Sequence, residues 1–220
     1  MITSFFYKKG TELETGISRS RMLAARGEKT GLLWVDLEAP NEFEEETLVE
    51  IFNFHPLAVE DCITDQSHPK VDDYEEYLFM VVHAITMKQK ETQEELEPVE
   101  LDIFIGENYV VTVHRSPLEC VAQTRELAVK KTTVIMSGSS DILAHAILDR
   151  LVDNYLPILG EYDVKIDVLE KEMFNHVSKN FLQTLLQTKQ DIFNLRRIIA
   201  PQRDTVYSLT RNPNRFIKPK

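Results

Sequence analysis

The sequence predicts an α+β or α/β fold in which helices sandwich a mixed β-sheet and a long antiparallel helical hairpin follows. Apolar runs of strand length are confined to residues 1–115, where short helical patterns separate them. Beyond residue 137, apolar residues recur at spacings of four and three over two long segments, which is typical of packed helices. We therefore expect an α/β domain over residues 1–136 and a helical hairpin over residues 137–220.

Five segments have the pattern of strands: residues 2–7, 31–37, 77–88, 99–105 and 109–114. The segment at 77–88 is a long apolar run, which indicates a buried strand. The two segments after it alternate apolar with polar side chains, the period of a half-buried strand. The last three segments are predicted to form an antiparallel meander, in which polar residues 89–98 connect the first two.

Short helices are predicted between and after these strands. Residues 42–52 place Leu48, Ile51 and Phe52 on one side of a helix. Pro56 opens another helix, because its fixed φ suits the first helical position, and His55 before it is expected to shape the turn. A third helix is predicted at residues 117–131. Ser140 is then expected to cap the helix that follows.

Two runs of residues at heptad spacing, here called seams, dominate the last third of the chain. Pro157 lies inside the first seam, and we expect it to kink the helix rather than end it, because the register continues beyond it. Residues 175–179 interrupt the pattern, and two long helices with a short joint are predicted to pack antiparallel. The first seam comprises Leu148, Val152, Tyr155, Leu159, Tyr162, Ile166, Leu169 and Met173, and the second Phe181, Leu185, Thr188, Ile192, Leu195, Ile199, Gln202, Val206 and Leu209.

Charge is unevenly distributed along the 220 residues. The formal net charge is −11. Residues 178–220 hold nine Lys and Arg against two Asp, a net charge of +7, so residues 1–177 carry −18. An acidic body disfavours binding to nucleic acid phosphates and attracts cations. Solubility alone is the simpler explanation of such a surface.

Several classes of protein are excluded or disfavoured. No apolar run approaches the roughly 20 residues that span a bilayer, and the N-terminus lacks the features of a signal peptide, so the chain as given is expected to be soluble. Cys62 and Cys120 cannot form a disulfide framework, which favours a reducing cytosol. Phosphate loops, nucleophile elbows and His-Glu-x-x-His are absent, so we do not expect an enzyme. Residues 211–220 do not complete a fold, which predicts a further element beyond them.

Two acidic groups are candidates for cation binding. Glu60 and Asp61 are expected to end the helix that Pro56 opens, where hard oxygen ligands would suit a divalent cation. His145, Asp149 and Asp153 share one helical face at spacings of four, and Asp149 adjoins the seam residue Leu148. For both groups a solvated acidic surface is the alternative.

Seven segments, in this order along the chain, carry a resemblance to a known family. They are WVD at 34–36, HPLAVED at 55–61, HPKVDDYEEYLF at 68–79, LDIFIGENYVVTVH at 101–114, AILDRLVDNY at 146–155, IDVLEKE at 166–172 and LRRIIAPQR at 195–203. Together they resemble the cytoplasmic part of CorA magnesium and cobalt channels. The resemblance implies an α/β sandwich followed by long helices, in a homopentamer with two membrane helices per subunit.

The resemblance also implies a regulatory role and a set of ligands. The membrane helices and the Gly-Met-Asn signature of the family are absent from these 220 residues, so the chain would be a regulatory domain at the cytoplasmic face of the cell membrane. In the family, Mg²⁺ binds between neighbouring protomers. Matching residue by residue places its acidic ligands at Glu60, Asp61 and Asp149, with Co²⁺ as a further candidate ion.

Two other functions stay open. A zinc-transporting relative shares the same scaffold, and only the missing loop and pore would separate the two. A free-standing soluble adaptor is the alternative from a different class, because two exposed seams could form a coiled coil with another subunit.

Overall fold

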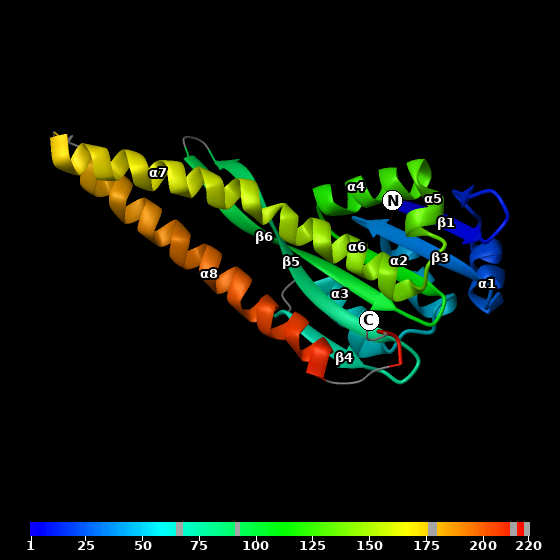
Figure 1. Cartoon of the computed structure of the whole chain (residues 1–220). Helices are drawn as coiled ribbons and strands as arrows, with labels where there is room; N and C mark the ends of the chain where they lie inside the picture. The colour runs from blue at the N-terminus through cyan, green and yellow to red at the C-terminus, as the bar shows by residue number, and fades with distance from the viewer. Residues whose placement is uncertain (65–67, 91–92, 176–179, 212–214, 218–220) are drawn as a thin grey trace.

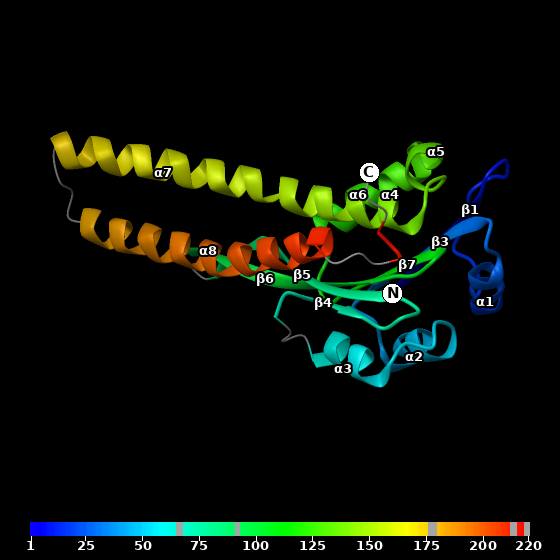
Figure 2. The same ribbon diagram turned by 60° about the horizontal axis from the view of Figure 1, so that its bottom comes forward.

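A computed structural model describes residues 1–64, 68–90, 93–175, 180–211 and 215–217. A seven-stranded sheet lies between two layers of helices, and a long helical hairpin extends from one of these layers (Figures 1 and 2). This arrangement confirms the predicted fold class. The division into residues 1–136 and 137–220 stays a prediction.

The sheet is mixed. Across it the strands lie in the order β2 (Glu14–Thr15), β1 (Ile2–Lys8), β3 (Gly31–Glu38), β7 (Tyr109–His114), β6 (Gln93–Ile105), β5 (Leu78–Lys90) and β4 (Lys70–Asp73). Neighbouring strands pair antiparallel, except that β3 and β7 pair in parallel. The predicted meander of β5, β6 and β7 is confirmed.

Two strands are longer than predicted, and two were missed. β5 continues to Lys90 and β6 begins at Gln93, so most of the polar segment 89–98 is strand rather than connection. The prediction was wrong here because residues 88–95 are all charged or polar, so no apolar alternation indicated a strand. The edge strands β2 and β4 have two and four residues, too short for a period to be recognised.

Both faces of the sheet are covered, so its central strands bury side chains on both sides. Helices α1 (Arg19–Gly27), α2 (Glu42–Glu50) and α3 (Pro56–Thr64) cover one face (Figure 2). Helices α4 (Glu119–Lys130), α5 (Thr132–Ile135) and α6 (Ser140–Asp153) cover the other. On β3, Leu33 and Val35 join the first core, while Leu32 and Trp34 join the second, as the period of two requires.

Helix α6 begins at Ser140, the residue that was predicted to be its N-cap. Ser139 is the N-cap, and Ser140 is the first helical residue. The Ser140 hydroxyl is buried and donates to the carbonyl of Gly106, 2.5 Å away. Its hydroxyl therefore ties α6 to the turn between β6 and β7 and does not cap the helix.

The residues of the first seam belong to two helices rather than to one kinked helix. α6 ends at Asp153, and α7 (Tyr155–Asn175) begins after Asn154. Pro157 lacks an N–H and its ring clashes with the carbonyl four residues earlier, at Asp153, so the break falls where α6 ends. The predicted seam also names the wrong buried residue within α6. Val152 is 54% exposed and Leu151 is buried, because α6 packs against the sheet.

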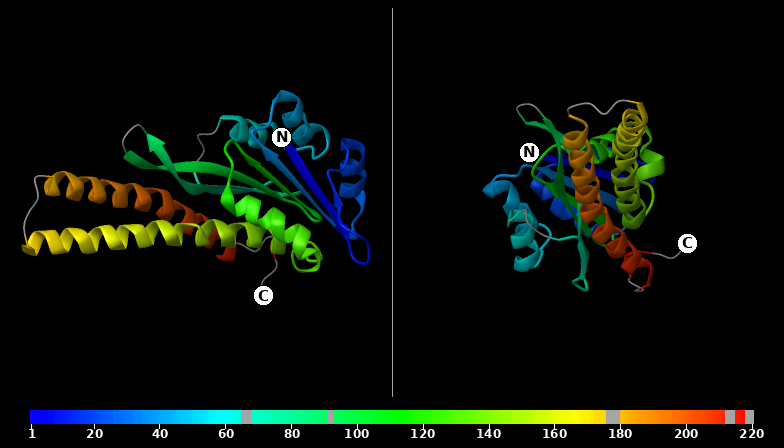
Figure 3. Two further views of the ribbon diagram at one scale, coloured as in Figure 1. Left: turned by 90° about the horizontal axis from the view of Figure 1, so that it is seen from above. Right: turned by 90° about the vertical axis from the view of Figure 1, so that its left-hand side faces the viewer.

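The antiparallel hairpin of α7 and α8 (Phe181–Arg211) is confirmed (Figure 3). Thr188, Leu195 and Gln202 are buried at intervals of seven on α8, as the second seam predicts. Tyr162 and Leu169 are buried on α7. The break predicted at 175–179 falls almost entirely outside the described residues, although α7 does end at Asn175.

A closed ring of hydrogen bonds fixes the root of this hairpin to the sheet. β4 stops pairing with β5 at Val81, which leaves the backbone of His83 facing α7 and α8. The His83 N–H donates to Gln202 Oε1 over 2.8 Å, Gln202 Nε2 donates to the Tyr155 hydroxyl over 3.1 Å, and that hydroxyl donates to the His83 carbonyl over 2.5 Å. Burial raises the pKa of Tyr155, so its hydroxyl keeps the proton it donates.

The segment after α8 also contributes to the core. Phe216 is 4% exposed and packs in the core on the α6 side of the sheet. Thr205 Oγ1 on α8 donates to the carbonyl of Pro69, 3.1 Å away, next to β4. Residues 215–217 therefore pack against the sandwich, which the sequence pattern did not predict.

We expect Gln202→Leu to lower the free energy of unfolding by about 1–3 kcal/mol, because the part-buried N–H of His83 loses its acceptor. Chemical denaturation measures this loss. Gln183→Leu, at an exposed position of α8, is the matched control and should change stability by less than about 0.5 kcal/mol. Equal losses in the two variants would contradict a role for the ring.

Candidate cation-binding residues and the buried polar core

Helix α3 presents Glu60 and Asp61 because its other side faces the core. His55 precedes Pro56 and accepts the Leu57 N–H through Nδ1 over 3.2 Å, so it caps the helix as expected of a turn residue. Ala58, Val59 and Cys62 are buried, and this apolar stripe continues the helix to Thr64. The expectation that Glu60 and Asp61 end the helix was therefore wrong.

The Asp61 carboxylate already has a cationic partner. Lys70 on β4 places Nζ 2.5 Å from Asp61 Oδ2 and 3.0 Å from Asp72 Oδ2. Burial alone would lower the pKa of Lys70, but hydrogen bonds and charge from both carboxylates outweigh it and raise that pKa. Asp61 is half-buried, whereas Glu60 is exposed. A single ammonium group thus bridges two carboxylates at this position.

The second predicted group lies on α6. His145, Asp149 and Asp153 are all exposed, so they share one solvent-facing side of the helix as predicted. Leu148 is half-buried and packs against the core, which places Asp149 at the edge of the packed face. Among the described residues, no ion pair or hydrogen bond engages the Asp149 carboxylate.

One copy of the chain does not bring the candidate ligands together. α3 packs in the core on one face of the sheet and α6 in the core on the other (Figure 2). Within the part of the chain that the structure describes, no group of three or more His, Cys, Asp or Glu is placed to hold a metal ion. An ion that engages both Asp61 and Asp149 would have to lie between two copies.

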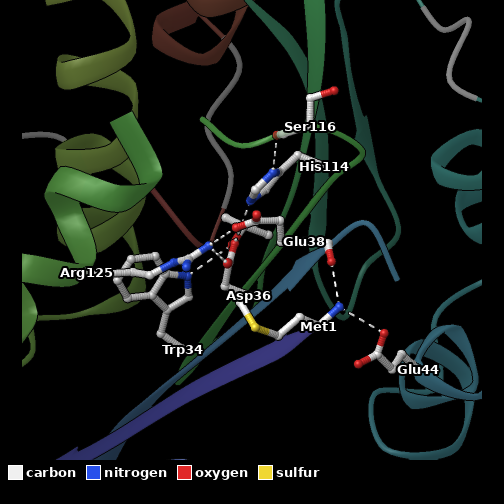
Figure 4. Close-up of polar contacts among 9 residues, drawn as sticks. Met1, Trp34, Asp36, Glu38, Glu44, His114, Ser116 and Arg125 are labelled. Atoms are coloured by element: carbon white, nitrogen blue, oxygen red, sulfur yellow. Dashed lines mark hydrogen bonds and ion pairs between the residues drawn. The ribbon is translucent and has the colours of Figure 1, made fainter. Parts of the chain in front are cut away.

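The sequence did not predict a buried polar network beside β3 (Figure 4). Asp36 is fully buried, and Arg125 on α4 donates to it. Arg125 also donates to Glu38 over 3.0 Å. Thr112 on β7 donates to Asp36 and accepts the Trp34 indole N–H over 3.1 Å. The network thus joins β3, β7 and α4.

His114 completes this network at the end of β7. Its Nδ1 donates to the Ser116 carbonyl over 2.7 Å, and its Nε2 lies 3.3 Å from Asp36 Oδ1 (Figure 4). A signal was present in the sequence, because Asp36, Thr112 and His114 are polar residues inside strands that are otherwise apolar. A single polar residue in such a strand does not name its partner, and α4 is distant in sequence.

Both thiols are buried and protonated. Burial raises the pKa of Cys120 to about 11, and burial with the nearby charge of Asp102 raises that of Cys62 well above its usual value. Thiolate is the form that binds metals and attacks electrophiles. Cys62, although it follows Asp61, is therefore a packing residue of α3.

A helix long and apolar enough to cross a bilayer is absent from the ranges that the structure describes.

Solved structures share this fold. The soluble domain of CorA from Methanocaldococcus jannaschii matches with a TM-score of 0.79 at 17% identity, covering 99% of this chain and 82% of that one. The full-length CmaX protein matches at 0.80 and 16%, covering 97% and 64%. The ZntB cytoplasmic domain from Vibrio parahaemolyticus matches at 0.64 and 14%, covering 96% and 80%. The architecture is thus of the class found in soluble domains of CorA-type proteins.

Sequence comparison assigns the family. The model for the CorA-like Mg²⁺ transporter protein matches residues 29–220. The putative metal ion transporter YfjQ of Bacillus subtilis is 35% identical over 80% of this chain and 53% of its own length. The cobalt/magnesium transport protein CorA of Thermotoga maritima is 31% identical over 74% of this chain and 46% of its own. The chain belongs to the CorA-like Mg²⁺ transporter family, and it spans about half the length of these relatives.

We expect Asp36→Ala to lower the free energy of unfolding by about 3–5 kcal/mol, because it leaves Arg125 without its buried partner. Glu38→Ala removes the more exposed partner of the same arginine and should cost about 1 kcal/mol or less. Chemical denaturation of the two variants measures both losses. A loss for Asp36→Ala no larger than that for Glu38→Ala would contradict the network's role.

Both cysteines should react with a thiol reagent at pH 8 far more slowly in the folded protein than in about 6 M guanidinium. Burial raises the pKa of both thiols above the ordinary value of about 8.5. Above that pH the unfolded chain loses these protons while the folded chain keeps them, so the free energy of unfolding falls as pH rises. Colorimetric thiol titration measures the reaction. Equal rates in folded and unfolded protein would show that the thiols are accessible.

Proposed function

We propose that this chain is the cytoplasmic, cation-sensing domain of a CorA-type magnesium and cobalt channel. The observation that carries the proposal is the family match over residues 29–220, together with relatives whose names describe metal ion transport. Because the chain spans about half of those relatives, transport itself would belong to the whole protein. The full-length protein would be a homopentamer, with this domain at the cytoplasmic face of the cell membrane.

The regulatory ion in this proposal is Mg²⁺, or Co²⁺, bound between neighbouring protomers by Glu60, Asp61 and Asp149. Two features of the structure support it. The Asp149 carboxylate is exposed at the edge of the packed face of α6. The sheet separates it from Asp61 within one copy, so the acids could share an ion only across a contact between copies.

The physical effect of such an ion follows from charge. Carboxylates that face each other across an interface repel when they are bare, and a divalent ion replaces this repulsion with bridging. Ion binding and closed assembly then stabilise each other reciprocally. Loss of Mg²⁺ would loosen the pentamer and favour the open channel. Mg²⁺ keeps much of its water, so a few carboxylates and weak affinity are sufficient.

Lys70 supplies a competitor for this ion. Its ammonium group forms ion pairs with Asp61 and Asp72, and both carboxylates raise the pKa of Lys70, so the group stays charged. A divalent cation that engages Asp61 must either displace Lys70 or use the other carboxylate oxygen. The lysine would thereby hold the affinity for Mg²⁺ low enough for release.

Mg²⁺ at about 20 mM should raise the melting temperature of the wild type by about 5 °C, because a ligand at about twenty times its Kd stabilises by about 2 kcal/mol. Asp61→Ala and Asp149→Ala should each lose most of this rise. Differential scanning fluorimetry at constant ionic strength measures it. Glu161→Ala, an exposed acid on α7, is the control and should keep the rise. Identical Mg²⁺ responses in all four proteins would show that the ligands are misassigned.

Lys70→Met should move the midpoint of the Mg²⁺ response to lower concentration, about threefold or more, because Asp61 loses its competing ammonium group. The midpoint is measured by titrating Mg²⁺ in the same melting experiment. Lys165→Met, which removes an exposed lysine from α7, should leave the midpoint unchanged. A midpoint unchanged in both variants would exclude Lys70 as a competitor.

A further inference from the structure

The ammonium group of Lys70 has partners from three elements of the fold. Asp61 comes from α3, Asp72 from β4 and Phe79 from β5. Lys70 and Asp72 are two residues apart on β4, so their side chains project to the same side of the sheet. Phe79 is paired with Asp72 across the two strands and packs in the core that α3 covers. All three partners therefore reach the ammonium group from the α3 side of the sheet.

The three contacts differ in kind and in length. Lys70 Nζ lies 2.5 Å from Asp61 Oδ2 and 3.0 Å from Asp72 Oδ2. It also lies 5.4 Å from the centroid of the Phe79 ring, which is within the range of a cation–π contact. An ammonium group has three N–H donors, so it can engage both carboxylates at once. Asp61 is the nearer of the two carboxylates.

This cluster is partly open to solvent. The exposed fraction of the side chain is 35% for Lys70, 31% for Asp61 and 40% for Asp72. A hydrated cation can therefore reach the Asp61 carboxylate without any opening of the core. The partial burial also makes the attraction between the ammonium group and each carboxylate stronger than it is between fully solvated charges.

The same contacts provide for the ammonium group when it gives up Asp61. A divalent cation at Asp61 repels the ammonium group, which then loses its nearer carboxylate. Asp72 Oδ2 is already within hydrogen-bond distance of Lys70 Nζ, and the Phe79 ring is already in contact. The stem of a lysine is flexible enough for the small shift that is needed. The displaced ammonium group therefore keeps two partners that it already has.

We propose that Asp72 holds the ammonium group of Lys70 when a divalent cation binds Asp61. This inference rests on the proposed function, because it concerns the same cation site. Without the cation, Asp61 and Asp72 share the ammonium group. With the cation, Asp72 and the Phe79 ring hold it alone. Asp72 is thus a positioning residue, which acts on the affinity for the cation through Lys70 and does not bind the cation itself.

The direction of the effect follows from these two states. Without the cation, Asp72 shares the ammonium group with a nearer carboxylate, so loss of Asp72 costs that state part of an ion pair. With the cation, Asp72 is the remaining carboxylate partner, so its loss costs that state the whole pair. Removal of the Asp72 charge therefore weakens cation binding. This direction is opposite to the one expected for Lys70→Met.

Titration of the chain with Mg²⁺ at constant ionic strength, followed by the melting temperature, tests the proposal. Asp72→Asn should raise the midpoint of the Mg²⁺ response about threefold, the size expected for loss of a partly exposed ion pair. Asp73→Asn is the matched control, because it removes the same charge from the next residue of β4, whose exposed side chain projects to the opposite side. Its amide oxygen can still accept the Glu75 N–H, as Asp73 Oδ1 does over 3.0 Å. The control should shift the midpoint by less than about 1.5-fold, because only screened, long-range charge is lost.

The same substitution in the Lys70→Met background separates a positioning residue from a ligand. Without the ammonium group Asp72 has nothing to hold, so Asp72→Asn should then shift the midpoint no more than Asp73→Asn does. The difference between the two backgrounds measures the coupling of Asp72 to Lys70. An equal rise of the midpoint in both backgrounds would show that Asp72 binds the cation directly, which would overturn the proposal.

The titration also keeps this inference apart from the proposed function. A wild type without any Mg²⁺ response would overturn the cation site and, with it, this role of Asp72. A wild type that responds, with Asp72→Asn no different from Asp73→Asn, would overturn the role of Asp72 alone. The midpoint is a concentration of Mg²⁺, so it can be compared between folded variants that start from different melting temperatures.

Discussion

The arrangement of the whole chain depends on a sheet that is buried on both faces. Leu33 and Val35 on β3 face one core while Leu32 and Trp34 face the other, so helices must cover both sides. That arrangement places the acids of α3 and the acids of α6 in different layers. A cation site built from both sets therefore requires more than one copy.

Buried polar groups hold the layers in fixed positions. The ring of His83, Tyr155 and Gln202 fixes the root of the hairpin where β4 stops pairing. Asp36 and Arg125 fix α4 against β3 and β7. Apolar packing tolerates small shifts, whereas satisfied polar networks specify one arrangement. Helix α4 and the root of the hairpin therefore take one arrangement on the sheet.

Periodicity predicted most of the fold. It was wrong where the residues that are buried differ from those that the spacing indicates. The meander and the seam of α8 follow directly from spacings of two and of four and three. Val152 was wrongly assigned to the buried seam. The seam continues on the side of α7 that packs against α8, whereas α6 packs a different side against the sheet. Gln202 fitted the heptad, but its bond to His83 joins residues 119 apart, which no local pattern reveals.

The candidate site was less predictable than the fold. Spacing alone showed two groups of acids and left a solvated acidic surface as the alternative for both. The choice of Glu60, Asp61 and Asp149 as one ligand set came from resemblance to the family, and it stays a prediction. Lys70 could not be foreseen, because its contact with Asp61 depends on how α3 lies over the short edge strand β4.

Sedimentation velocity of the wild type and of Asp149→Ala, each with about 20 mM Mg²⁺ or with EDTA, tests the central claim most directly. Mg²⁺ is expected to increase the sedimentation coefficient of the wild type beyond that of the EDTA form, and Asp149→Ala is expected not to respond. A wild type with the same sedimentation coefficient in Mg²⁺ and in EDTA would contradict a cation site between copies.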